Sequence, residues 1–339
     1  MKSYLLKRLI LAFWTLLVIL FVSYGLLRLA PGSPAKSAFF GGEAPGSAVS
    51  AEKGDLKINK QLEAELNLDK PIAVGFYLWL KGIVTAGDFG RSAAVDPGRP
   101  VLLMIGERLP VTLMLNAIAV FLVYATAIPI GIYSGVHPGG YFDRFSGFVL
   151  FFLYSLPVMW VALVLQVLFC QGGIMPYFPL RSIFSINPDH TSWMLVWDYC
   201  KSLFLPVVCL SYAGLAGLSR FARSGMREVL GCEYIRTARA KGVPEHRVVY
   251  VHALRNALIT LITLFSGLLP GLVAGSIIVE YVFGIQGMGA LSMLALSSRD
   301  YPLQMALFAF SGILTLSGVL LSDLLYMAAD PRITLYGRN

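Results

Sequence analysis

Charged residues are scarce in this sequence. Only 14% of its 339 residues are Asp, Glu, Lys or Arg, whereas 57% are hydrophobic. A water-soluble domain of this length needs a larger share of polar residues to cover its surface. The composition therefore argues against an ordinary soluble protein and indicates a chain embedded in a membrane.

The motifs of several common enzyme classes are also missing. The dipeptide Gly-Lys occurs nowhere in the chain, which excludes the phosphate-binding loop Gly-x-x-x-x-Gly-Lys-Ser/Thr. Neither Gly-x-Ser-x-Gly nor His-Glu-x-x-His is present, and the four histidines are scattered, so the sequence does not support an intramembrane enzyme. We expect no catalytic residue, no metal site and no cofactor bound by this chain.

Cysteine is also rare, and the positions of the cysteines form no metal-binding pattern. The four are Cys170, Cys200, Cys209 and Cys232. Their spacing does not match the paired cysteines of a zinc site. We expect free thiols packed among apolar groups, with a disulfide between Cys170 and Cys200 as the alternative.

Long apolar runs without any charged residue recur along the chain. About 20 such residues suffice to cross the hydrocarbon core of a bilayer as a helix. Six runs approach or exceed this length: Leu9–Leu27, Leu109–Tyr133, Phe145–Cys170, Leu203–Ser219, Ala257–Val279 and Pro302–Ser322. The sequence therefore predicts an all-α polytopic membrane protein with six transmembrane helices. The first run exceeds the apolar core of a signal peptide, about 7–15 residues, and is expected to remain in the mature protein.

Basic residues indicate on which side of the membrane each segment lies. Loops that remain in the cytoplasm are enriched in Lys and Arg. Such residues cluster before the first run and between the fourth and fifth runs: Lys2, Lys7, Arg8, Arg220, Arg223, Arg227, Arg236, Arg239, Lys241, Arg247 and Arg255. With six spans both clusters fall on one side, so the N- and C-termini are predicted to be cytoplasmic. The formal charge of +8 is explained in this way, without nucleic acid as a partner.

Three parts follow from this topology. Residues 1–30 are expected to form an N-terminal transmembrane helix, residues 31–100 an extracytoplasmic segment, and residues 101–339 a five-helix core. In the extracytoplasmic segment, the spacing of apolar residues predicts a short amphipathic helix at Leu56–Leu68. The aromatic-rich stretch Pro71–Val84 is expected to lie flat at the outer membrane interface.

The cytoplasmic loop 220–256 carries the most specific local pattern. A polar helix is predicted to end at Gly242 and a second helix to open at Pro244. Glycine favours the left-handed position that ends a helix, and proline favours the first turn of the next one. Two short helices joined by a bend would form a projection that a partner can grip. A loop that only sets the topology is the alternative, but charge bias does not explain the Gly242–Pro244 break.

This loop resembles the coupling loop of ABC importer permeases, whose general pattern is Glu-Ala-Ala, three residues, then Gly. Here Arg236-Thr237-Ala238 stands ahead of Gly242, so the glutamate and the first alanine of the pattern are replaced. The run Tyr234–Gly242 and the later His252–Asn256 are instead similar to the dipeptide/oligopeptide/nickel branch of that family. The resemblance implies a role in ATPase coupling for Glu233, Tyr234, Arg236, Thr237, Ala238, Arg239, Lys241, Gly242, Pro244, His252, Arg255 and Asn256.

Other segments carry the same resemblance. They are Lys7–Leu9, Leu27–Gly32, Arg108–Leu113, Glu280–Phe283, Gly287–Gly289, Arg299–Pro302, Asp323–Tyr326 and Asp330–Arg332. The resemblance implies the type I ABC importer permease fold. It also implies a complex with a second homologous permease subunit as a heterodimer, two ATP-binding subunits that use ATP and Mg, and an extracytoplasmic substrate-binding protein.

Four further residues are candidates either for the transport pathway or for structural roles. Pro270 and Gly271 lie inside the fifth run and predict either a hinge or a close helix contact. Glu280 follows the end of the fifth run, where its carboxylate either contacts substrate or ties the helix end to a neighbour. Asp323, at the end of the sixth run, is expected to pair with a nearby arginine.

The function implied by the resemblance is that of a permease subunit in the bacterial inner membrane. The subunit would translocate di- or oligopeptides in an ATP-driven importer and would not itself be an enzyme. Nickel or another small solute is the alternative cargo, because the same branch includes such importers. An ion-driven secondary transporter is a further alternative, but the six runs hold none of the charged residues that such transporters use near mid-membrane.

Overall fold

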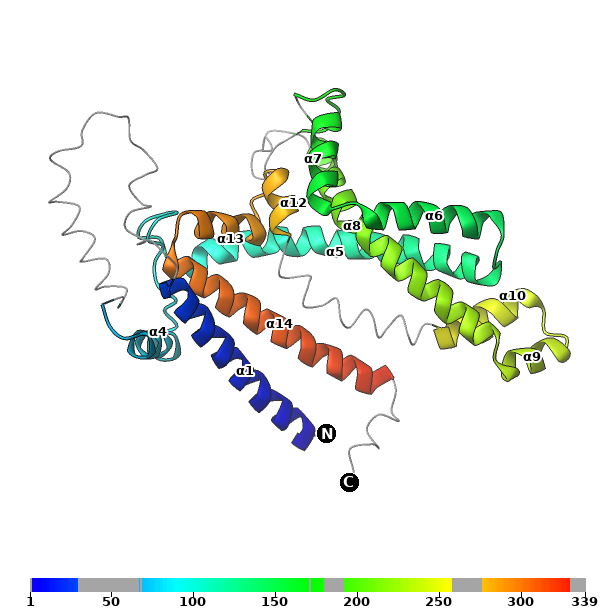
Figure 1. Cartoon of the computed structure of the whole chain (residues 1–339), viewed down its shortest axis with the longest axis horizontal. Coiled ribbons are helices and arrows are strands. Elements are labelled where there is room, and N and C mark those ends of the chain that lie inside the picture. Colours follow the sequence, from blue (N-terminus) through cyan, green and yellow to red (C-terminus); the bar gives the residue numbers. More distant parts are fainter. Residues whose placement is uncertain are drawn as a thin grey trace. The chain divides into compact units, whose positions relative to one another are not determined.

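The computed structural model describes residues 2–29, 67, 69–170, 172–179, 192–257 and 276–329 (Figure 1). Within these residues the regular elements are helices, accompanied by two isolated β-bridges, Arg91–Pro100 and Cys170–Phe178. The chain divides into two compact units. Unit 1 comprises Met1–Pro110 and Gly287–Ser317, and unit 2 comprises Val111–Gln286 and Gly318–Asn339.

Within the described residues, four helices are long and apolar enough to cross a membrane: Leu6–Leu29, Val101–Val136, Val196–Leu230 and Tyr301–Leu321. They coincide with the first, second, fourth and sixth apolar runs, whose helical prediction is confirmed. The fourth is far longer than its apolar run because α8 (Ser192–Leu230) continues through polar residues on both sides and includes Pro206. The fifth run lies almost entirely outside the described residues, so the count of six spans stays a prediction.

The third apolar run is not the continuous helix that the sequence predicts. It forms α6 (Tyr141–Ser155) and α7 (Val158–Phe169), which meet at an angle of 97°. The break lies at Leu156, which is extended with φ −83° and ψ 130° because Pro157 disfavours a helical conformation in the residue before it. The carbonyl of Leu156 accepts a hydrogen bond of 2.8 Å from the Tyr212 hydroxyl of α8, which stabilises the break.

Unit 1 contains α1 (Lys2–Leu29), α4 (Ile72–Ala86), α13 (Met288–Ser297) and the N-terminal parts of α5 (Val101–Val136) and α14 (Tyr301–Ala329). Its core joins α5, α13 and α14 through Ile105, Leu291 and Leu303, all of which are buried. Burial of such side chains contributes about 1.5–3 kcal/mol each.

Helix α4 occupies most of the stretch Pro71–Val84, for which the sequence predicted only a location at the outer interface, and that location stays a prediction. It lies against α1 at Gly75, where a Cβ atom would stand 2.4 Å from the Tyr24 hydroxyl. Arg28 Nη1 also donates to the carbonyl of Lys70 at 2.7 Å, which fixes the approach to α4. The amphipathic helix expected at Leu56–Leu68 falls outside the described residues except for Asn67.

A buried carboxylate organises the segment before α5. Asp300 is fully buried and its Oδ1 accepts from the backbone N–H of Leu303 at 3.2 Å, which caps the start of α14. Its Oδ2 accepts from the Ser92 hydroxyl and from the backbone N–H groups of the next three residues at 3.0–3.1 Å. One side chain therefore holds both a helix end and the segment 92–95.

Unit 2 contains the rest of α5, together with α6, α7, α8 and α12 (Ile277–Val282). Buried residues from α5, α7, α8 and α12 form one core: they include Leu115, Ala162, Cys209 and Val279. All four cysteines are free thiols, as expected from the sequence, with Cys170 buried and Cys200 exposed. The alternative disulfide between these two is therefore not present.

Candidate functional site

The loop after α8 folds as two short helical pieces around a bend. Helix α9 (Glu233–Ala240) is followed by α10 (Glu245–Arg247) and a π-helical turn, η2 (Val248–Ala253). We call residues 232–256 the knob. In Figure 1 it lies beyond the end of α8, with α9 and α10 at its tip.

Gly242 ends α9 as the sequence predicts. Its φ is +76°, in the left-handed region, and a Cβ there would be strained by about 1–2 kcal/mol. Its backbone N–H donates a hydrogen bond to the carbonyl oxygen of Arg239 at 2.9 Å. The backbone N–H of Val243 donates to the carbonyl oxygen of Ala238 at 3.2 Å. This hydrogen-bond pair is the usual glycine-ended helix cap. Pro244 stands as the N-cap of α10, one position earlier than a first-turn proline.

Side-chain contacts stiffen the bend. Arg239 grips Glu245 across it with two hydrogen bonds, Nε to Oε2 at 3.1 Å and Nη2 to Oε1 at 2.6 Å. The hydrogen bond from Arg239 holds the pKa of Glu245 below its ordinary value. Asn256 Nδ2 donates to the Tyr234 hydroxyl at 2.6 Å, so the last residue of the knob is tied to its first helix.

An apolar root fixes the knob to the transmembrane helices. Ile235 of α9 and Val248 of η2 are fully buried. They belong to one cluster with Met226 of α8 and Ile132 of α5. Sequence reasoning missed these root residues, although isolated apolar residues such as Ile235 among polar neighbours are the signal that marks them.

The predicted coupling residues all lie in the knob. Ala238 is half-buried, and the others are exposed: Glu233, Tyr234, Arg236, Thr237, Arg239, Lys241, Gly242, Pro244, His252, Arg255 and Asn256. Arg236 pairs with Glu233 at 2.7 Å, and the Thr237 hydroxyl donates to the Glu233 carbonyl at 3.0 Å. The exposed surface of the knob is thus largely polar, although Tyr250 and Val251 of η2 are also exposed, while its root is apolar and buried.

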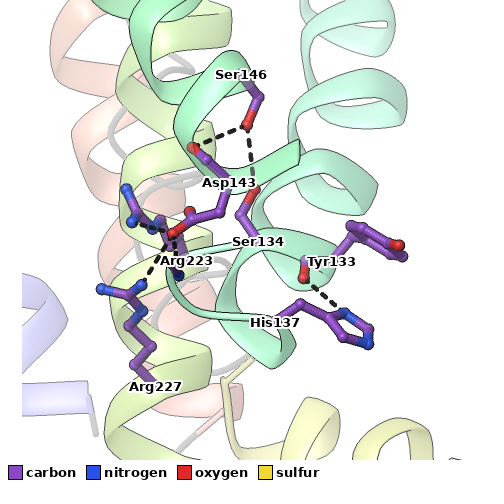
Figure 2. A network of polar contacts seen from close by, with 8 residues as sticks. Tyr133, Ser134, His137, Asp143, Ser146, Arg223 and Arg227 are labelled. Atoms are coloured by element: carbon purple, nitrogen blue, oxygen red, sulfur yellow. Dashed lines mark hydrogen bonds and ion pairs between the residues drawn. The ribbon is translucent and has the colours of Figure 1, made fainter. Parts of the chain in front are cut away.

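An ion-pair network around a buried carboxylate lies beside the knob and was not found from the sequence. Asp143 of α6 has a side chain only 2% exposed, and its Oδ2 accepts from Arg223 Nη2 at 2.6 Å and Arg227 Nη2 at 3.2 Å. The same oxygen accepts from the backbone N–H of Gly139 at 2.9 Å. Figure 2 shows both arginines reaching from α8 toward this carboxylate. We call Asp143, Arg223 and Arg227 the clamp.

Helices α5 and α8 touch backbone to backbone close to the clamp. A Cβ at Gly131 would lie 2.5 Å from Ala222 Cβ and 2.6 Å from the Ser219 carbonyl oxygen. One turn later, a Cβ at Gly135 would lie 2.8 Å from Met226 Cβ. Small residues four positions apart are the usual means of such close packing in membranes.

The remaining predicted site residues do not join the knob. Glu280 is fully buried on α12, where Thr112 Oγ1 of α5 donates to its Oε1 at 3.0 Å. This contact fits the expectation of a tie between helices, whereas a substrate role stays a prediction. Asp323 is half-buried on α14, and its pairing with an arginine stays a prediction. Pro270 and Gly271 lie outside the described residues.

Comparison with protein families identifies the chain. Residues 127–335 match the family described as binding-protein-dependent transport system inner membrane component. Residues 1–117 match the N-terminal part of membrane components of the same systems. The chain belongs to this permease family. The permease is therefore a multi-pass protein of the inner membrane and the non-catalytic membrane component of an ABC transporter.

Curated relatives cover the permease almost from end to end. The oligopeptide transport system permease protein AppB of Bacillus subtilis is 35% identical over 98% of this chain and 99% of its own length. The inner membrane ABC transporter permease protein YejB of Escherichia coli O157:H7 is 31% identical over 100% of both chains. A putative peptide transport system permease protein of Brucella abortus is 32% identical over 98% and 99% of the two chains.

Proposed function

We propose that the permease carries di- and oligopeptides across the inner membrane as one subunit of an ATP-driven importer. The support for this cargo is that full-length relatives are described as oligopeptide or peptide transport permeases. The observation that carries the mechanism is the knob, a projection with a buried apolar root and a largely polar, exposed surface.

The knob has the properties of an energy-coupling contact. The bend at Gly242 and the Arg239–Glu245 grip give it a fixed shape, so a partner that holds it would transmit force rather than deform it. Its root at Ile235 connects it to α5 and α8 through buried contacts. Because the sequence has no phosphate-binding loop, ATP and Mg²⁺ are used by partner subunits that grip the knob.

The family description suggests in general that such a permease works with ATP-binding subunits and a binding protein, and the proposed complex contains both. Two ATP-binding subunits dock on the cytoplasmic side, a second homologous permease completes a heterodimer, and an extracytoplasmic binding protein delivers the peptide. In this arrangement the permease has six spans in a type I importer fold and both termini in the cytoplasm. Residues 1–30 form the first span, 31–100 the extracytoplasmic segment and 101–339 the core with the coupling loop 220–256.

Transport then follows from two discrete states of the complex. Closure of the ATP-binding subunits on ATP would move the knob, and the helices rooted in it would rock between inward-open and outward-open forms. ATP shifts this equilibrium only because it binds more tightly to the closed arrangement of the partner subunits than to the open one.

Two knob substitutions test the coupling role. Arg236→Glu replaces an exposed cation on α9 with an anion beside Glu233, and Gly242→Pro forbids the φ of +76° at the bend. Both should abolish peptide-stimulated ATP hydrolysis by the reconstituted complex. Lys81→Glu, an exposed charge reversal on α4, serves as the matched control and should leave stimulation intact. Unchanged stimulation in both knob variants would refute the coupling role.

The cargo and the energy source need separate tests. Uptake of labelled di-, tri- and longer peptides should be lost in a deletion strain and restored by the permease gene, while nickel uptake should not change. Restoration of nickel uptake alone would replace the peptide assignment. Substrate movement by the purified permease without ATP-binding subunits would instead favour a secondary transporter.

A further inference from the structure

We propose that Asp143 is a positioning residue for coupling, which makes the start of α6 move as one body with α8 and the knob. This inference rests on the proposed function, because it concerns how motion of the knob reaches the other helices. The clamp is separate from the knob surface that a partner would grip. Arg223 and Arg227 lie within the predicted loop 220–256, but no clamp residue is among those to which the resemblance gives a coupling role.

The contacts of Asp143 connect three pieces of the chain: the α5–α6 turn, the start of α6 and the more distant α8. Its Oδ2 receives the N–H of Gly139 from the α5–α6 turn and the guanidinium groups of Arg223 and Arg227 from α8 (Figure 2). The two arginines stand one helical turn apart, so they approach the carboxylate from the same face of α8. The α5–α6 turn and α8 are therefore joined at a single atom.

The clamp lies on the direct route from the knob. Met226 stands between Arg223 and Arg227 in α8 and belongs to the apolar root of the knob. A displacement of the knob root thus acts on α8 at the residues that hold Asp143. Through Asp143 the same displacement reaches α6, which continues through the 97° bend into α7.

An ion pair suits this task better than apolar packing. Charge-assisted hydrogen bonds are strong and depend steeply on geometry, so they resist sliding between the two helices. The carboxylate side chain is 2% exposed and the two arginines are 33% and 41% exposed, so water screens these pairs less than it screens a pair at the open surface. On α6 itself Phe145 and Phe148 are 69% exposed within the described chain, so they do not anchor it.

The variant that isolates the clamp is Asp143→Asn. Its amide oxygen can keep the place of Oδ2 and the bond from Gly139, and its nitrogen can take the place of Oδ1, which has no hydrogen-bond partner in the described protein. Only the charge that holds the arginines is lost. Asp143→Glu retains the charge, and Arg223→Gln removes the shorter ion pair from the other side.

The first measurement is transport per ATP hydrolysed in the reconstituted complex. We expect Asp143→Asn to assemble and hydrolyse ATP at the basal rate while peptide uptake per ATP falls about tenfold, in the range of usual coupling free energies. Asp143→Glu should recover part of the loss. The double variant Asp143→Asn with Arg223→Gln should transport no less peptide per ATP than the more impaired of the two single variants, because both substitutions break the same contact. Normal uptake per ATP in Asp143→Asn would overturn the inference.

The second measurement asks whether α6 follows the knob. Spin labels at Tyr141→Cys and His246→Cys, both exposed, report the distance between the α6 start and the knob in a background without the native cysteines. The distance should be the same with and without ATP in the parent protein and should broaden or shift with ATP in Asp143→Asn. An equally fixed distance in Asp143→Asn would contradict the clamp.

Failure of this inference can be distinguished from failure of the proposed function. Arg236→Glu is measured in the same preparations. If Arg236→Glu abolishes stimulated hydrolysis and Asp143→Asn transports normally, the clamp inference alone is wrong. If Asp143→Asn does not assemble, Arg227→Gln, which removes only the 3.2 Å pair, takes its place. Reduced peptide uptake per ATP in this variant would support the clamp, and normal uptake per ATP would overturn it.

Discussion

Replacing Gly131 with alanine should force α5 away from α8 next to the knob. The added Cβ would stand 2.5 Å from Ala222 Cβ and 2.6 Å from the Ser219 carbonyl oxygen. The second of these atoms belongs to the backbone, so the contact cannot be relieved by rotating a side chain. One helix has to shift relative to the other.

The size of the effect follows from a matched control. Gly217 and Gly225 lie in α8, and a Cβ at either would meet nothing within 4 Å. Glycine-to-alanine exchange inside a helix stabilises by about 1 kcal/mol through propensity alone. This gain is common to all three positions and cancels on comparison. The difference between Gly131→Ala and Gly217→Ala is therefore the overpacking cost, about 1–3 kcal/mol.

Thermal unfolding of the detergent-solubilised permease measures this difference, and peptide uptake measures its consequence. We expect Gly217→Ala and Gly225→Ala to be as stable as the parent or more stable. Gly131→Ala should unfold at a lower temperature than either control and transport less peptide. A melting temperature for Gly131→Ala equal to that of Gly217→Ala would show that the two helices are not in backbone contact at Gly131.

Three further predictions concern the root, a buried carboxylate and the bend. Ile235→Ala leaves a cavity at a fully buried position and should lower the free energy of unfolding by about 2–5 kcal/mol, measured by thermal unfolding. Ile277→Ala, at a side chain that is 46% exposed, should lower it far less. Equal losses of stability in the two variants would contradict an apolar root. Asp300→Ala leaves the Ser92 hydroxyl and four N–H groups, three in residues 93–95 and that of Leu303, without their side-chain acceptor, at about 1–3 kcal/mol for each fully buried group. Limited proteolysis should therefore cut within 88–100, and an unchanged pattern would refute the role of Asp300. Because the pKa of Glu245 is lowered in the folded knob, its pairing with Arg239 stabilises above the unfolded pKa of about 4.3 and is lost as the pH falls through the lower folded value. The stability difference between the parent and Glu245→Gln should be under about 1 kcal/mol, constant from about pH 8 to 5, and gone in stronger acid; a difference that changes near neutral pH would point to another group.

Local signals in the sequence were sufficient for the bend of the knob, though not for its buried root. Glycine at 242 and proline at 244 restrict their own backbone, so the bend follows from two residues without knowledge of the rest of the fold. The long apolar runs were equally informative for the four long apolar helices that the structure describes. Each of these predictions depends on neighbours in the chain.

Other features depend on contacts that sequence proximity does not reveal. The break at Leu156 has a local signal in the following proline, but the prediction of a continuous helix rested on the apolar character of the run alone. The clamp joins Asp143 to Arg223, 80 positions away, and neither residue is unusual where it stands. The packing of Gly131 on α8 has the same origin. Such pairings are decided by how the helices assemble, and only the three-dimensional arrangement shows them.

A density map of the assembled transporter is the most direct test of the account. The account predicts that α9 and the bend at Gly242 lie inside a surface cleft of an ATP-binding subunit on the cytoplasmic side, with Arg236 and His252 at the contact. A map in which this bend is bare, or lies on the outer side of the membrane, would contradict it.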